Sequence, residues 1–134
     1  MFEGRSGFET RVGRDLEKRG IFFSYELRSF PYKSKPYNAE CTECGSKEVW
    51  ETRKYTPDFF FLNGVIVEAK GHWKPKERKL LMALRESNPE LDIRMVFMRD
   101  NWLTTKHVQR YSDWCDKRGI KWAIGTVPGE WVDE

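Results

Sequence analysis

The first thirty residues carry two different spacings of apolar side chains. Phe8, Val12 and Leu16 recur at the interval of a helix, and a glycine follows them as a stop signal. The preceding Ser-Gly-Phe-Glu, which begins at Ser6, fits a capping box at the start of this helix. Residues 21–30, IFFSYELRSF, are rich in strand-forming residues and end before a proline, so they predict a strand.

Further along the chain, strand patterns and helix patterns alternate. The other predicted strands are two apolar runs within residues 55–73, joined by Asn63-Gly64, and then residues 91–98 and 120–125. The predicted helices are residues 74–87 and 105–119. The side chains expected to face inward from these two helices are Leu80, Leu81, Leu84, Val108, Tyr111 and Cys115.

This order of elements predicts an α/β fold in a single domain, residues 1–134. Helices connect the last strands to one another, so these strands are expected to run parallel. Residues 32–54 interrupt the pattern with proline, asparagine, glycine and two cysteines. We predict that they form an irregular insert, and an insert of this length usually has a function or is mobile.

Composition narrows the function classes. Apolar residues make up 39% of the chain and charged residues 34%, as in a globular protein with a charged surface. No apolar run reaches the roughly 20 residues that span a bilayer, and no signal-peptide pattern is present, so we expect a cytoplasmic protein without a membrane partner. The net charge is only +3, and basic runs such as YKSKPY and KPKERK leave two interpretations open, a phosphate-backbone partner and a merely solvated surface.

The turn at Asn63-Gly64 decides which charged side chains meet. A two-residue turn would place Asp58 on the face opposite to Glu68 and Lys70. A three-residue loop, with Gly64 in the left-handed position of a bulge, would pair Asp58 with Glu68 and put all three charges on one face. We favour the second register because it accounts for the charges.

Directly paired strand residues have β-carbons about 4.5–5.5 Å apart, a distance at which two carboxylates repel each other. One divalent cation between Asp58 and Glu68 would remove this conflict, and magnesium prefers such oxygen ligands. Lys70 would then lie beside the metal, where it could activate a water or offset charge on a phosphate. A surface salt bridge between Lys70 and Glu68 is the simpler alternative.

The segment PDFFFLNGVIVEAK resembles the Pro-Asp…Glu-x-Lys signature of the restriction-endonuclease-like nuclease superfamily. The segments RSGFE, SYE, YTPDF, NGVIVEAKG, NPELDIRMVF, GIKWA and PGEW, in this order, resemble the phage endonuclease I family of Holliday-junction resolvases. The resemblance covers nearly the whole chain outside the insert. It implies a restriction-endonuclease-like core, that is, a mixed sheet flanked by helices, within an intertwined homodimer.

The resemblance also implies an activity. The chain would be an endodeoxyribonuclease, dependent on magnesium or manganese, that resolves four-way junctions and other branched DNA in the host cytoplasm. The residues implied as metal ligands are Glu9, Asp58, Glu68 and Ala69, the last through its backbone carbonyl. Lys70 would act beside the nucleophile, and Glu9 would come from the other protomer. At the third position of a capping box, Glu9 could instead only hold the helix end.

Phosphate contacts are expected from Arg5, Lys74 and Lys76, because these residues flank the catalytic segments in the sequence. Two other functions stay open. A mismatch-nicking or restriction-type endonuclease would prefer a short duplex sequence to a branch. A non-catalytic, zinc-stabilised DNA-binding module would use the acidic residues only for structure.

Cys41 and Cys44 have the spacing of a zinc knuckle, but a structural zinc needs four ligands. We hypothesise one zinc shared by Cys41 and Cys44 of both protomers. A turn with free thiols and a site within one chain are the alternatives, the latter completed by His72, His107 or Cys115. Zinc near half an equivalent per chain would support the shared site, and one equivalent the site within the chain.

Overall fold

The computed structural model describes residues 1–34, 37–38, 48–49 and 51–133. A five-stranded sheet forms its centre, and the strands lie in the order β1-β6-β7-β8-β9. Their bounds are β1 Ser24–Tyr25, β6 Phe59–Phe60, β7 Val65–Lys70, β8 Asp92–Phe97 and β9 Trp122–Ile124. The first three strands are antiparallel and the last three are parallel, which confirms the predicted α/β class and the parallel final strands.

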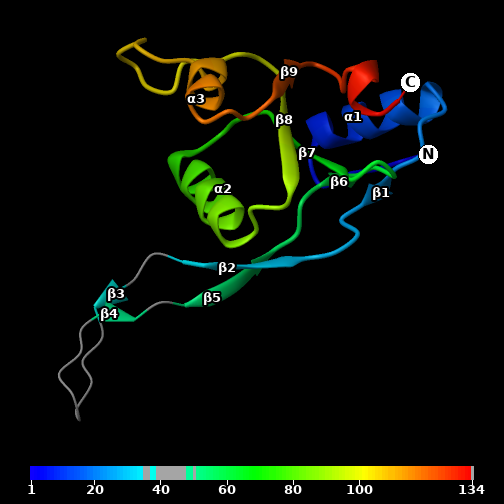
Figure 1. Cartoon of the computed structure of the whole chain (residues 1–134). Coiled ribbons are helices and arrows are strands. Elements are labelled where there is room, and N and C mark those ends of the chain that lie inside the picture. The colour runs from blue at the N-terminus through cyan, green and yellow to red at the C-terminus, as the bar shows by residue number, and fades with distance from the viewer. Residues whose placement is uncertain (35–36, 39–47, 50, 134) are drawn as a thin grey trace.

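Helices cover both faces of this sheet (Figure 1). Helix α1, Gly7–Lys18, packs on one face together with the short 3-10 helix η1, Gly129–Trp131. Helices α2, Pro75–Ser87, and α3, Tyr111–Lys117, pack on the other face. No helix in the described part of the chain has the length and apolar character needed to cross a membrane.

Strand β7 divides its side chains between these two layers. Val65, Val67 and Ala69 belong to the apolar cluster that includes α1, whereas Ile66 belongs to the cluster under α2 and α3. Because side chains alternate along a strand, Glu68 and Lys70 follow Ile66 onto the α2 side. The acidic residue thus enters the sheet within an otherwise apolar strand.

The hairpin between β6 and β7 has the predicted bulged register. Phe60 pairs with Ile66, and the N–H of Phe61 donates to the carbonyl of Val65 at 3.0 Å. The N–H of Gly64 donates to the carbonyl of Phe61 at 3.0 Å, which closes a three-residue loop. Gly64 has a φ of 91°, a conformation that glycine adopts without strain.

The predicted strand at residues 21–30 is wrong in its extent. Only β1 pairs with the central sheet, and Glu26 breaks the strand with a φ of 50°. The N–H of Glu26 donates to the carbonyl of Asp58 at 2.8 Å, so this kink is fixed by the segment before β6. The chain then leaves the sheet and begins a separate strand, β2, at Phe30.

The described ends of the insert at residues 32–54 are not irregular. Strand β2, Phe30–Lys33, pairs antiparallel with β5, Thr52–Tyr55, and the short strands β3, Tyr37–Asn38, and β4, Glu48–Val49, pair beyond them. The β2–β5 ribbon passes beneath α2 and leads away from α1 and both termini (Figure 1). The insert therefore contributes one wall beside α2.

The third helix is shorter than its predicted range of 105–119. Residues before Tyr111 form a loop, in which Trp102 and Arg110 make an antiparallel bridge and His107 has a φ of 53°. Val108 was expected to face inward, but 79% of it is exposed. Tyr111 and Cys115 are buried as expected.

Candidate active site

Asp58 and Glu68 lie side by side at the end of the β6–β7 hairpin that is away from the turn. The register that pairs Phe59 with Val67 places these two acids opposite each other. The N–H of Asp58 donates to Oε1 of Glu68 at 2.8 Å, and the N–H of Ala69 donates to Oδ2 of Asp58 at 2.9 Å. Only 5% of Asp58 and 4% of Glu68 is exposed, so both carboxyl groups are held within the protein.

Burial and mutual repulsion make this pair costly to ionise. Burial, followed by the charges of Glu68 and Glu9, raises the pKa of Asp58 to about 8. Burial likewise raises the pKa of Glu68, although Lys70 and a hydrogen bond from Tyr55 oppose that change. Two buried carboxyl groups that repel each other favour either a shared proton or a cation between them.

Lys70 joins this pair as predicted. Its Nζ lies 3.9 Å from Oε2 of Glu68 and 2.8 Å from Oε2 of Glu77. Burial lowers the pKa of Lys70, but Glu68 and Glu77 more than offset it, so the pKa is raised and the amine stays charged. The three predicted residues Asp58, Glu68 and Lys70 therefore come together on one side of the sheet.

Glu9 has partners other than the helix end. Ser6 caps α1 by accepting the N–H of Glu9 at 3.1 Å, which is the first half of the predicted capping box. The Glu9 carboxylate, however, accepts the hydroxyl of Tyr25 and, at 3.4 Å, the N–H of Arg5. Glu9 is 8% exposed and close enough to raise the pKa of Asp58. Its side chain is thus directed by β1 and not by its own helix.

The described residues contain no group of three or more His, Cys, Asp and Glu side chains arranged to hold a metal ion. Within one chain, Asp58 and Glu68 are therefore a pair, which Glu9 does not complete. The chemistry of the pair still suits a hard divalent cation, because it offers carboxylate oxygens in a buried setting. Ala69, the fourth predicted ligand, is 2% exposed and lies between Glu68 and Lys70 in β7.

The three predicted phosphate-binding residues occupy different settings. Arg5 forms an ion pair with Glu26 at 2.8 Å, while 76% of its side chain remains exposed. Lys74 is the exposed N-cap residue of α2, and Lys76 is exposed in the first turn of this helix.

Cys41 and Cys44 lie outside the described residues. The proposed additional zinc ligands have other environments. His72 is exposed after β7, and the His107 ring stacks on Trp102 with 5.1 Å between ring centroids. Cys115 is fully buried, and burial raises the pKa of its thiol to about 12. A thiol buried in this way packs as a small apolar side chain.

Two residues of the site were missed in the sequence. The hydroxyl of Tyr55, at the end of β5, donates to Oε2 of Glu68 at 2.5 Å. Glu77 in α2 binds Lys70 and also accepts the N–H of Lys74 at 3.2 Å. Glu77 follows Lys74 by three residues, so a capping pattern was the available signal for it. A small cavity of about 40 Å³ lies among Tyr55, Glu68, Lys70 and Glu77.

Comparisons with known proteins find similar sequences over nearly the whole chain. The model of the family described as phage endonuclease I matches residues 2–134. The chain belongs to this family. Its relatives include Endonuclease I of Escherichia phage T7, which is 39% identical over 131 residues, or 97% of this chain and 78% of the T7 protein. Endodeoxyribonuclease 1 of Enterobacteria phage T3 is 37% identical over 131 residues, or 97% of this chain and 77% of the T3 protein.

Proposed function

We propose that this member of the phage endonuclease I family is a structure-selective DNA endonuclease that resolves four-way junctions and other branched DNA in the host cytoplasm. The observation that carries the proposal is the buried contact between Asp58 and Glu68 with Lys70 beside it. Membership of the family and the names of the T7 and T3 relatives support DNA as the substrate.

In this proposal, Asp58 and Glu68 hold a magnesium or manganese ion, together with the backbone carbonyl of Ala69. When bound, the cation supplies positive charge to the scissile phosphate and its leaving oxygen. Lys70, as a charged amine, orients the attacking water or offsets charge on the phosphate, and the cavity beside it is large enough for a water molecule. Hydrolysis would leave a 5′-phosphate and a 3′-hydroxyl.

We further propose that the central sheet is a restriction-endonuclease-like core and that two chains form an intertwined homodimer. The partner's Glu9 would then complete the ligand set of Asp58 and Glu68. The position of Glu9 supports this, because Glu9 lies in α1 and its carboxylate is held by Tyr25 of β1, so both elements come from the first part of the chain. Exchange of these elements between two chains would carry Glu9 with them.

Cleavage of a synthetic four-way junction and of a linear duplex of the same sequence, each with and without magnesium, tests the proposal. We expect magnesium-dependent cutting of the junction, little cutting of the duplex, and loss of cutting in Asp58→Asn with junction binding retained. Preference for a short duplex sequence would favour a restriction-type enzyme instead. Tight junction binding with no cutting by the unaltered protein would favour a DNA-binding module.

A further inference from the structure

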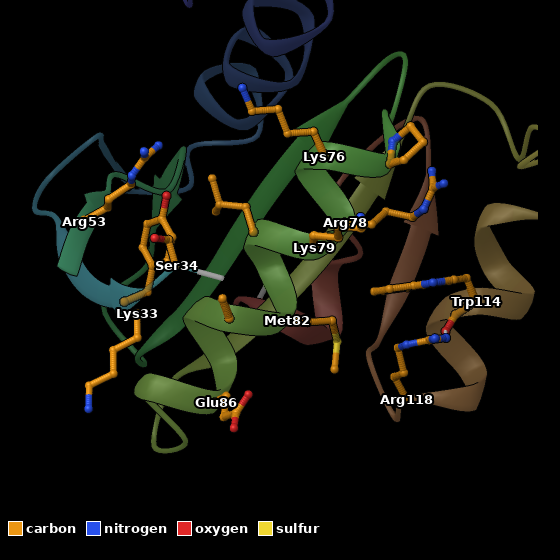
Figure 2. A pocket seen from close by; sticks show the side chains of 14 residues that line it. Lys33, Ser34, Arg53, Lys76, Arg78, Lys79, Met82, Glu86, Trp114 and Arg118 are labelled. Carbon is orange, nitrogen blue, oxygen red and sulfur yellow. The ribbon is translucent and has the colours of Figure 1, made fainter. Parts of the chain in front are cut away.

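A groove of about 680 Å³ lies over the outer side of α2, between the β2–β5 ribbon and α3. Figure 2 shows Lys33 and Arg53 on one side of α2, and Trp114 and Arg118 on the other. Between them, α2 itself contributes residues from its first turn to its last. The groove is thus bounded by three elements that are far apart in the sequence.

Charge is concentrated in this groove. Of the fourteen described residues that line it, six are basic and one, Glu86, is acidic, so these residues carry a net charge of +5 where the whole chain carries +3. The rest of the protein is therefore slightly acidic. The basic residues are Lys33, Arg53, Lys76, Arg78, Lys79 and Arg118.

Several of these cations are available to a ligand. Lys33, Lys76 and Lys79 are exposed, and no ion pair within the described part of the chain holds their amines. Arg53 is also exposed, although it pairs with Glu51 at 2.8 Å. Arg118 differs, because its guanidinium stacks on Trp114 at 3.9 Å and is held in place.

The groove adjoins the carboxylate pair. Leu80 lines both the groove and the small cavity that contains Glu68 and Lys70. On α2, the groove residues Lys76 and Arg78 flank Glu77, which binds Lys70. On β5, Arg53 lies two residues before Tyr55, whose hydroxyl binds Glu68. The groove and the cavity beside the carboxylate pair are therefore neighbours, with Leu80 between them.

The size of the groove matches a duplex better than a single anion. The lining residues of α2 run from Pro75 to Glu86, which at 1.5 Å per residue is about 17 Å. One strand of B-form DNA carries a negative charge every 3.4 Å along the axis, so about five phosphates fit this length. Six cations for about five phosphates is a close balance of charge.

We propose that this groove binds the phosphate backbone of one duplex arm of the substrate, with Lys33, Arg53 and Lys79 as contacts beyond the cleavage site. The proposal rests on the proposed function, because it takes the DNA that is cut as the occupant. Contacts to phosphates carry no base information, so the groove adds affinity and orientation without sequence preference.

The test compares two triple variants in an Asp58→Asn background, so that the DNA is not cut. The groove variant is Lys33→Gln, Arg53→Gln and Lys79→Gln. The control removes three exposed lysines outside the groove, as Lys18→Gln, Lys106→Gln and Lys121→Gln. Dissociation constants for a fluorescent four-way junction and for a linear duplex are measured at several salt concentrations.

A plot of the logarithm of the association constant against the logarithm of the salt concentration has a negative slope, and each lost phosphate contact reduces its magnitude by about 0.9. The magnitude should therefore fall by about 2.7 in the groove variant and by almost nothing in the control. Junction affinity at moderate salt should fall at least about tenfold in the groove variant. The single change Lys79→Gln should lose about 0.9 of the slope, which supports the proposal even if the triple variant unfolds.

Equal slopes for the groove variant and the control would overturn the proposal. This result is also the one expected if the groove binds an acidic protein and not DNA. The proposed function would still stand if the unaltered protein cuts junctions in a parallel assay. If the unaltered protein neither binds nor cuts DNA, the proposed function and this inference fail together. The unfolding temperatures of both variants show whether a change in slope reflects lost contacts.

Discussion

The Nζ atom of Lys70 is 2.8 Å from Oε2 of Glu77, so the first turn of α2 fixes the lysine of the sheet. The contact joins two elements that lie on either side of a short turn. It leaves the amine 3.9 Å from Glu68, close enough to act with that carboxylate and too far for a direct hydrogen bond.

We expect Glu77→Gln to lower the rate of junction cleavage about 10- to 100-fold, as is typical of residues that orient a reacting group. Glutamine keeps an oxygen that can accept the N–H of Lys74, so α2 should keep its cap. Single-turnover cleavage and junction binding are the measurements. Glu90→Gln is the charge-matched control, because Glu90 is exposed and lies outside the site.

In a second prediction, Tyr55→Phe removes the hydroxyl that donates to Glu68. Hydrogen bonds to charged groups contribute about 1.5–3 kcal/mol, so the free energy of unfolding should fall by about this amount. Cleavage should also slow, because Glu68 loses a fixed orientation. Urea unfolding and cleavage assays check both effects, and unchanged stability would mean that Glu68 does not depend on Tyr55.

The pH dependence of stability follows from the raised pKa of Asp58. In the unfolded chain Asp58 loses its proton near its ordinary value of 3.8, but in the folded, metal-free protein only near pH 8. The folded state therefore binds more protons between these values, and the free energy of unfolding falls as pH rises from about 4 to about 8. Below this window the stability is fully present.

One pKa unit corresponds to about 1.4 kcal/mol, so the difference between 3.8 and about 8 corresponds to a loss of about 6 kcal/mol across this range, shared with Glu68. Asp58→Asn should flatten the profile, and magnesium should stabilise the protein at pH 8 more than at pH 5. Thermal unfolding at each pH is the measurement. A profile that rises from pH 4 to 8 in metal-free buffer would contradict the account of the pair.

The hairpin offers a test of the register. Gly64→Ala should cost about 1 kcal/mol, because its φ of 91° strains any other residue although no atom lies within 4 Å of an added β-carbon. Gly7→Ala is the matched control, since its β-carbon would also meet nothing within 4 Å and its backbone is helical. Denaturant unfolding should show a loss of stability for Gly64→Ala only. Equal effects of the two changes would show that the left-handed backbone at Gly64 is not the cause of the loss.

The parts of the fold set by local patterns were predictable from the sequence. The α1 and α2 patterns and the Asn63-Gly64 turn depend on neighbouring residues, and the structure has them close to their predicted positions. The register was chosen because it brings Asp58 and Glu68 together, and the pairing of the strands confirms it independently.

The errors have a common physical cause, which is that tertiary contacts override local propensity. The strand predicted through Glu26 breaks because its N–H binds the carbonyl of Asp58. The helix predicted from residue 105 begins later because Trp102 pairs with Arg110. Tyr55 was missed for the same reason, since no spacing rule relates β5 to Glu68 in β7.

The hydrogen bonds between Asp58, Glu68 and the opposing backbone mean that the reactive groups also fasten the two strands together. An alanine at either position would remove the reactive carboxylate and also the hydrogen bond that holds the strand ends together. An inactive alanine variant therefore says little about catalysis. Asparagine or glutamine keeps an oxygen that can accept the backbone hydrogen bond but removes the negative charge. Chemistry and architecture can thus be separated at these two positions only by the choice of substitute.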